Sequence, residues 1–102
     1  MYLWGVLLLR ESAIQKLIKV RLTQKSCVVY KFASPAQRGV PDLVVLVPDG
    51  RVVFMEVKQT GADATPQQHY HLARINAQGV RAGVVHSVDE AIALVWPQTI
   101  EP

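Results

Sequence analysis

The segment from Gly39 to Lys58, GVPDLVVLVPDGRVVFMEVK, constrains the fold of this chain more than any other. Valine, leucine and phenylalanine dominate both of its arms, as is typical of β-strands. Between the arms lies Pro48-Asp49-Gly50. Proline followed by aspartate and glycine is typical of a type I turn that is closed by a left-handed glycine. The segment therefore predicts a β-hairpin with a three-residue loop.

The register of this hairpin brings two acids together. Counting back from the loop pairs Val47 with Arg51 and puts Asp42 opposite Glu56, at a Cβ separation of roughly 4.5–5.5 Å. Lys58 shares their face, roughly 6.6 Å beyond Glu56. Facing carboxylates repel each other, so they favour a cation between them, and a hard divalent ion with oxygen ligands would suit. The alternative is a surface hairpin whose charges point into water.

Composition and charge indicate one globular domain. The 102 residues are enough for a single core, and 50% of them are hydrophobic while 19% are charged. The net charge of +3 and the pI of about 9.3 favour polyanions only mildly, too weakly to indicate nucleic-acid binding alone. The single cysteine, Cys27, excludes an internal disulfide and fits an intracellular compartment.

The first nine residues are apolar but too short for a membrane span, which needs roughly 20 residues. They also lack the basic start and the cleavage site of a signal peptide. We expect residues 1–9 to form an extension that packs on the domain or on a partner subunit. Residues 10–97 are expected to form the single domain, and residues 98–102 a C-terminal tail.

A first helix is expected over residues 10–25, and Glu11 continues its apolar stripe backwards. A glutamate on an inward stripe is costly unless it is paired. The alternative is a first-turn acid that interacts favourably with the helix dipole. Ser12 and Gln15 fit a capping box, although the helix could start earlier. The stripe consists of Ile14, Leu17, Ile18 and Leu22.

A second helix is expected to begin at Thr65-Pro66-Gln67-Gln68 and to stop at Gly79. Thr65 is the N-cap, proline suits the first helical position, and Gln68 closes a capping box. This local role explains Gln68 without any catalytic function. His69 and His71 lie on different faces of the helix, so they are poorly placed to bind one metal together.

The remaining elements complete an α/β fold. Strands are expected over residues 27–32 and 81–86, and a third helix is expected after a capping box at Ser87 to Glu90. The order is α-β-β-β-α-β-α. The second helix is a crossover that makes its two flanking strands parallel. We therefore expect a mixed sheet flanked by helices, with the hairpin at its centre and Glu11 near the hairpin's open end.

The order Glu11, Gly39-Val-Pro-Asp42, Glu56-Val-Lys58 and Gln68 resembles the VRR-NUC family, the virus-type replication-repair nucleases of the PD-(D/E)xK superfamily. An isolated E-x-K occurs often by chance. A G-V-P-D and an E-V-K separated by one hairpin are much more specific. The resemblance covers roughly residues 10–95 and implies a restriction-endonuclease-like αβββαβ core.

The resemblance also implies a chemistry, the hydrolysis of DNA phosphodiester bonds with Mg²⁺ or Mn²⁺ to leave 5′-phosphate and 3′-hydroxyl ends. Asp42, Glu56 and the backbone carbonyl of Val57 would bind the metal. Glu11 would contribute through the metal's waters or through a second site. Lys58 would hold or activate the attacking water.

Gln68 would align the metal cluster, the lysine or the DNA backbone, and Gln67 is its alternative with poorer spacing. Small stand-alone members of this family resemble junction resolvases, which act as homodimers on branched DNA such as four-way junctions. The resemblance therefore implies a structure-selective endonuclease, acting as a homodimer in the cytoplasm of a bacterial or phage-infected cell. No membrane partner and no nucleotide cofactor are expected.

Two other functions remain open. One is a catalytically silent DNA-binding or assembly subunit that keeps the nuclease fold, and the intact Asp42, Glu56 and Lys58 set argues against it. The other is an α/β domain with a charged hairpin and an unknown ligand.

Overall fold

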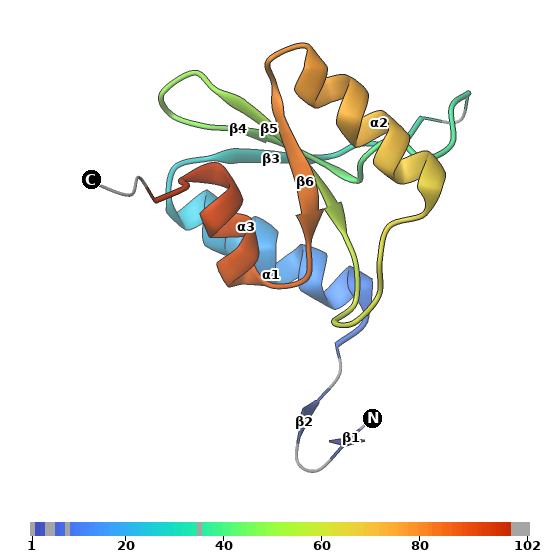
Figure 1. Cartoon of the computed structure of the whole chain (residues 1–102). Helices are drawn as coiled ribbons and strands as arrows, with labels where there is room; N and C mark the ends of the chain where they lie inside the picture. Colours follow the sequence, from blue (N-terminus) through green and yellow to red (C-terminus); the bar gives the residue numbers. More distant parts are fainter. Residues whose placement is uncertain (1, 4–5, 8, 35, 99–102) are drawn as a thin grey trace.

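The chain forms a mixed four-stranded sheet with three helices (Figure 1). This computed structural model describes residues 2–3, 6–7, 9–34 and 36–98. From the first helix onward, the elements follow the predicted α-β-β-β-α-β-α order. The elements are β1 (Tyr2–Leu3), β2 (Val6–Leu7), α1 (Glu11–Gln24), β3 (Val28–Lys31), β4 (Leu43–Leu46), β5 (Val52–Val57), α2 (Pro66–Ala77), β6 (Arg81–Val85) and α3 (Val88–Val95).

The predicted hairpin is the centre of the sheet, whose strand order is β3-β4-β5-β6. Strands β4 and β5 are antiparallel, and Leu43 pairs with Met55, which is the register counted from the turn. The Gly50 N–H donates to the Val47 carbonyl at 2.9 Å, and Gly50 has a φ of 93°, so the type I turn with its left-handed glycine is confirmed. Strands β5 and β6 are parallel, as expected for a crossover through α2.

The hydrophobic core lies between one face of the sheet and the neighbouring helices α1 and α3 (Figure 1). Val53, Met55 and Val57 of β5 are fully buried on this face. They pack with Ile14, Ile18 and Leu22, which confirms three of the four residues of the predicted stripe. Helix α2 covers part of the opposite face, where its Leu72 is buried.

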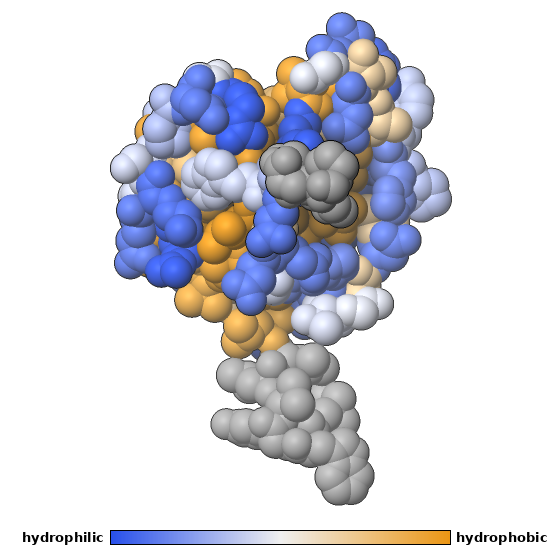
Figure 2. Space-filling view, turned by 60° about the vertical axis from the view of Figure 1, so that its left-hand side comes forward, coloured by the Kyte–Doolittle hydropathy of each residue, from blue (hydrophilic) through white to orange (hydrophobic). Residues whose placement is uncertain are grey.

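The sheet face opposite the core is only partly covered. Figure 2 shows one side of the body, on which apolar residues reach the surface between hydrophilic ones. Large apolar side chains remain exposed on the two strands farthest from α2, namely Val28, Tyr30 and Phe32 on and next to β3 and Leu46 on β4.

Two details of α1 differ from the prediction. Arg10 is the N-cap and makes no side-chain capping bond, so the Ser12–Gln15 capping box is wrong. The reason is that the extended Arg10 already starts the helix, because its carbonyl accepts from the N–H groups of Ala13 and Ile14. Leu17, predicted on the inward stripe, is 49% exposed.

The apolar N-terminus contains a short hairpin of β1 and β2 that was not predicted. The two strands pair with each other, and in Figure 1 they stand away from the body of the domain. Packing of this extension on a partner subunit stays a prediction, and residues 1, 4, 5 and 8 of the extension lie outside the described part of the chain. Most of the predicted tail, residues 99–102, also lies outside it. None of the helices described is long and apolar enough to cross a bilayer.

Candidate active site

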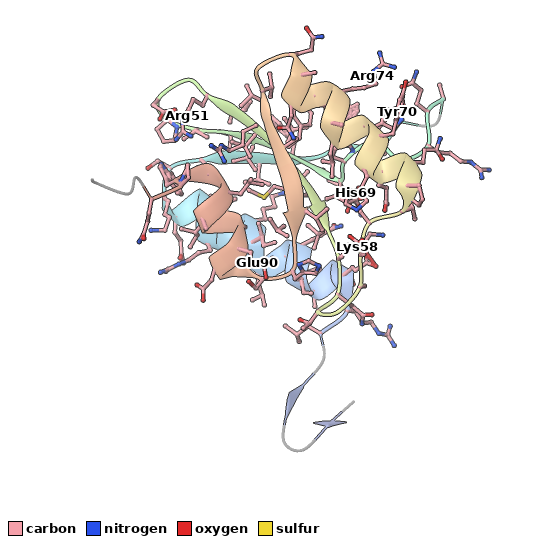
Figure 3. All side chains as sticks on the ribbon, in the orientation of Figure 1. Arg51, Lys58, His69, Tyr70, Arg74 and Glu90 are labelled. Atoms are coloured by element: carbon pink, nitrogen blue, oxygen red, sulfur yellow. The ribbon has the colours of Figure 1, made fainter. Side chains whose placement is uncertain are left out.

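The predicted acids and the lysine meet at the edge of the sheet where β4 begins and β5 ends. Asp42 immediately precedes β4, Glu56 is the penultimate residue of β5, and Lys58 follows β5. Glu11 is the first residue of α1. Figure 3 shows Lys58 at this end of the sheet, beside the segment that leads into α2. The hairpin and the start of α1 together position these four side chains.

Glu56 is the most unusual side chain of this site. It is 2% exposed, and its Oε1 atom has no hydrogen-bond partner among the residues that the structure describes. Burial raises the pKa of Glu56 to about 8, with a further contribution from the neighbouring Asp42, while the charge of Lys58 opposes the rise. A buried carboxylate without a partner is costly. The site is therefore built to hold either a proton or a cation next to this oxygen.

Asp42 lies beside the end of the adjacent strand. Its Oδ2 atom accepts a hydrogen bond from the Val57 N–H at 3.2 Å. The next N–H, that of Lys58, donates to Val85 of β6 on the other side. Because the N–H and C=O of one residue in an extended strand point to the same side, the Val57 carbonyl faces the Asp42 side as well. Two carboxylates and one backbone carbonyl therefore converge on this edge.

Lys58 and Glu11 form an ion pair with 4.0 Å between Nζ and Oε1. The lysine side chain is only 15% exposed, whereas the glutamate is 46% exposed. Glu11 thus lies at the rim of the site rather than inside the core. It is a first-turn acid of α1 that pairs with Lys58, so the expectation that it points inward on the apolar stripe is wrong.

Gln68 closes the predicted capping box, which is confirmed. Its Oε1 atom accepts from the Thr65 N–H at 2.8 Å, and its own N–H donates to Thr65 Oγ1 at 3.2 Å. The side-chain oxygen is thereby used, and the amide nitrogen remains as the donor. Its neighbour Gln67 packs against Gly39, where a Cβ would come within 3.0 Å of the Gln67 backbone. The loop before Asp42 is therefore held against the start of α2.

The donor set fits a hard divalent ion. In the described ranges, no group of three or more His, Cys, Asp and Glu side chains could hold a metal. A site here would combine the carboxylates of Asp42 and Glu56 with the Val57 carbonyl, and all of these ligands are oxygens. Oxygen ligands supplemented by waters suit Mg²⁺ and Mn²⁺. The unpartnered Glu56 oxygen is the atom that such an ion would satisfy.

Two of the histidines, His69 and His86, make contacts with other groups than the four side chains of this site. His69 Nε2 contacts Asp63 at 3.0 Å. His86 lies between two acceptors, Glu90 Oε1 at 2.9 Å and the Ala62 carbonyl at 2.8 Å. These contacts, led by that with Glu90, raise the pKa of His86. They fasten the loop between Lys58 and α2 to the start of α3.

The contacts that His86 makes with Glu90 and Ala62 were not predicted from the sequence. The four-residue spacing of His86 and Glu90 across a helix start is the signal that was present. The connection also changes the predicted capping box of α3. Ser87 does accept from the Glu90 N–H at 3.1 Å, but the Glu90 carboxylate accepts from the His86 N–H at 3.2 Å instead of turning back to Ser87.

Comparison with known proteins identifies relatives in sequence and in fold. Residues 2–89 match the family model described as the VRR-NUC domain. "Putative nuclease p44" of Acyrthosiphon pisum secondary endosymbiont phage 1 is 39% identical over 82 residues, 80% of this chain and 88% of that protein. A solved structure described as a VRR_NUC domain matches with a TM-score of 0.77 at 29% identity, covering 87% of this chain and 97% of that one. A second, a VRR_NUC domain protein, has a TM-score of 0.71 at 19% identity, covers 87% of both chains and shows likeness of fold alone.

Proposed function

The chain belongs to the VRR-NUC domain family of nucleases, and from that premise we propose that it is a Mg²⁺- or Mn²⁺-dependent DNA endonuclease selective for branched DNA. The observation that carries the metal dependence is the buried Glu56 carboxylate, whose Oε1 has no partner among the described residues. Protein side chains leave this oxygen unsatisfied beside a second acid, Asp42. A cation-binding role is the chemical explanation that uses both acids.

The ion would be held by Asp42, Glu56 and the Val57 carbonyl. The chemistry that it supplies is polarisation of the scissile phosphate and a lowered pKa of bound water. Glu56 would be held as a carboxylate with the ion bound, because a cation next to Oε1 would compensate the charge that burial disfavours. The Val57 N–H bond to Asp42 fixes the orientation of the second carboxylate.

Lys58 would act on the attacking water and on the charge that develops on the phosphate. Its ammonium lies at the edge of the site and is mostly shielded from solvent, so its charge is screened less than that of an exposed lysine. Glu11 faces it across 4.0 Å and would position it, or would bind the waters of the metal.

Gln68 would donate from its amide nitrogen to a phosphate oxygen of the DNA backbone. Its oxygen already accepts from Thr65, which disfavours a role as a metal ligand. Gln67 is less suited, because it packs against Gly39.

The substrate proposal rests on the family. The proposed recognition reads the shape and the phosphate backbone of the DNA and not its base sequence. Two copies related by a two-fold axis would present two centres to two strands of a junction. The phage origin of the relative supports a bacterial or phage-infected cell as the setting.

The direct experiment compares four-way junction, flap and linear duplex DNA in Mg²⁺, in Mn²⁺ and in chelator. We expect nicking of the branched substrates in either metal, none in chelator, and slower cutting of the duplex. Sedimentation analysis of the same sample is expected to give a dimer. Absence of cleavage on every substrate in both metals, with binding retained, would instead identify a silent DNA-binding subunit.

Metal binding has its own test, Asp42→Asn. Loss of one charged ligand is expected to weaken Mn²⁺ affinity at least tenfold by calorimetry, because an amide oxygen is a weaker ligand than a carboxylate. Asp49→Asn is the matched control, because Asp49 lies at the opposite end of the same hairpin and pairs with Arg51. Equal affinities for Asp42→Asn and the unmodified chain would contradict the ligand assignment.

A further inference from the structure

A second site lies outside the metal centre, in a cleft between α1 and the adjoining strands β3 and β4. The cleft has a volume of about 200 Å³. Its helix side is formed by residues at spacings of three and four, which places them on one stripe of α1. The lining residues are Ser12, Gln15, Lys16, Lys19, Lys31 and Leu43.

Three lysine residues line this cleft, and none of its described lining residues is acidic. Lys16, Lys19 and Lys31 are exposed, and none of them forms an ion pair within 4.0 Å in the part of the chain that the structure describes. Like charges at helical neighbours, such as Lys16 and Lys19, repel each other. The lining therefore brings together three positive charges that pair with no described carboxylate within 4.0 Å, beside the hydroxyl of Ser12 and the amide of Gln15, which can donate to an anion.

The cleft adjoins the candidate metal centre along the chain, although Leu43 and Asp42 project to opposite faces of the sheet. Ser12 follows Glu11, Leu43 follows Asp42, and Lys31 pairs with Leu43 across the two strands. From Glu11 to Lys19 the helix rises by about 12 Å at 1.5 Å per residue. This length corresponds to roughly three to four nucleotides at 3.4 Å of rise per nucleotide in one strand. The lysines thus follow a line that leads away from the two acids.

We propose that this lysine cleft binds backbone phosphates of the DNA strand that flanks the scissile bond, about two to four nucleotides from it. The proposal rests on the nuclease function of the neighbouring centre. A repeated negative charge matches a repeated positive one, so a strand suits the cleft better than a single small anion. Lysine contacts to phosphate carry no base information, and they orient the strand across the metal centre whatever its sequence.

The experiment measures DNA affinity in chelator, so that binding is read without cleavage. The double variant Lys16→Gln with Lys19→Gln is compared with the control Arg21→Gln with Lys25→Gln. Both variants remove two charges from α1 or its end. Arg21 projects from the side of α1 opposite the one that carries Lys16 and Lys19. We expect the cleft variant to bind about tenfold more weakly at ~0.1 M salt and its salt slope to fall by about 2, while the control stays near the unmodified protein.

Lys31→Gln is an independent test, because Lys31 lies on β3 and not on α1. It is also expected to weaken DNA binding. In addition, a substrate trimmed so that no phosphates reach the cleft should bind the unmodified protein as weakly as the full substrate binds the cleft variant. The cleft variant should be insensitive to the trimming. Equal losses in the cleft variant and the control, or a loss independent of substrate length, would overturn the proposal.

Inorganic phosphate distinguishes a small-anion site from a strand site. We expect millimolar phosphate at constant ionic strength to leave DNA binding unchanged, and full displacement by phosphate would overturn the proposal. Because the readout is binding in chelator, a failure of the metal chemistry leaves this result interpretable. If the cleft variant cleaves DNA and binds it with unchanged affinity, the proposal that the cleft binds phosphates is wrong, while the proposed nuclease function stands.

Discussion

Glu56 is the residue at which stability and the proposed chemistry oppose each other. Its carboxyl is buried, and its pKa is raised to about 8 from an ordinary value of 4.5. Between these values the folded, metal-free protein holds a proton that the unfolded chain releases. The contribution of Glu56 to the free energy of unfolding is therefore most favourable below pH 4.5, and it falls as the pH rises toward 8.

The first prediction follows from the direction of this pH dependence. Glu56→Gln should stabilise the metal-free protein at pH 7 by on the order of 3 kcal/mol. The reason is that a neutral amide takes the place of a carboxyl group that must bind a proton when the protein folds. It should also flatten the loss of stability between pH 4.5 and 8. Urea unfolding in chelator across this range measures both effects. A variant less stable than the unmodified chain at pH 7 would show that Glu56 is already satisfied in the protein.

Lys58 carries the second prediction at this scale. Lys58→Ala should lower the single-turnover cleavage rate by about 10² to 10⁴, the usual contribution of a positioned catalytic group. DNA affinity in chelator should change little. Lys25→Ala is the control, because this exposed lysine follows the far end of α1. Cleavage within a few-fold of the unmodified rate would reject the role proposed for Lys58.

At the scale of elements, the loop before β4 depends on one glycine. Gly39 has a φ of +84° and lies against the start of α2, where a Cβ would come within 3.0 Å of the Gln67 backbone. Gly61 has a φ of +83° with nothing within 4 Å, so it provides the same backbone conformation in open space. The pair separates the strain of a left-handed alanine from a steric clash.

The third prediction uses this pair. Gly61→Ala should cost about 1 kcal/mol of stability from backbone strain alone. Gly39→Ala should cost roughly 2 to 4 kcal/mol, because the Gln67 backbone must move as well. It should also slow cleavage, since the loop leads directly into Asp42. Thermal melts and cleavage rates of the two variants give the comparison. Equal losses of stability would show that the start of α2 moves away from the new Cβ without a measurable penalty.

The loop between β5 and α2 is fastened by His86, which gives the fourth prediction. Hydrogen bonds to Glu90 and to the Ala62 carbonyl, together with the charges of Glu90 and Asp63, raise its pKa above 6.5. The fastening is thus fully present below pH 6.5 and is lost as the pH rises through the raised value. We expect an NMR titration of the imidazole to show a pKa above 6.5 and Glu90→Gln to lower it. An unchanged value in that variant would mean that Glu90 does not hold the ring.

Hydrogen exchange of the loop amides provides the structural readout of the same fastening. Protection of Gly61 and Ala62, corrected for the intrinsic rate, should fall as His86 loses its proton. In Glu90→Gln the fall should occur at lower pH. The pH dependence of loop protection should then follow the protonation of His86 and not that of Asp42 and Glu56.

At the scale of the whole molecule, most of the fold followed from local chemistry. The turn residues Pro48-Asp49-Gly50 set the hairpin register, and this register placed Asp42 opposite Glu56. Capping chemistry correctly predicted the start of α2 at Thr65. These features depend on residues close in sequence, whose geometry is governed by backbone preferences and short hydrogen bonds.

The remaining features depend on how distant segments pack. The burial of Glu56, the ion pair between Lys58 and Glu11, and the contact of His86 with Ala62 join separate elements. The lysine cleft likewise requires α1 to lie beside β3 at a particular angle. Periodicity marks which face of an element is apolar, but it does not give the distances between side chains on different elements.

The sequence separation within the site has a consequence for the order of folding. Asp42 and Glu56 lie on one hairpin, which forms on the microsecond scale, whereas Lys58 and Glu11 join opposite parts of the chain. The acids therefore meet in water, before the packing of helices removes Glu56 from solvent. The penalty for burying that carboxyl arises late, after the main barrier. We therefore expect the stability gained in Glu56→Gln to be expressed in a slower unfolding rate, with the refolding rate nearly unchanged.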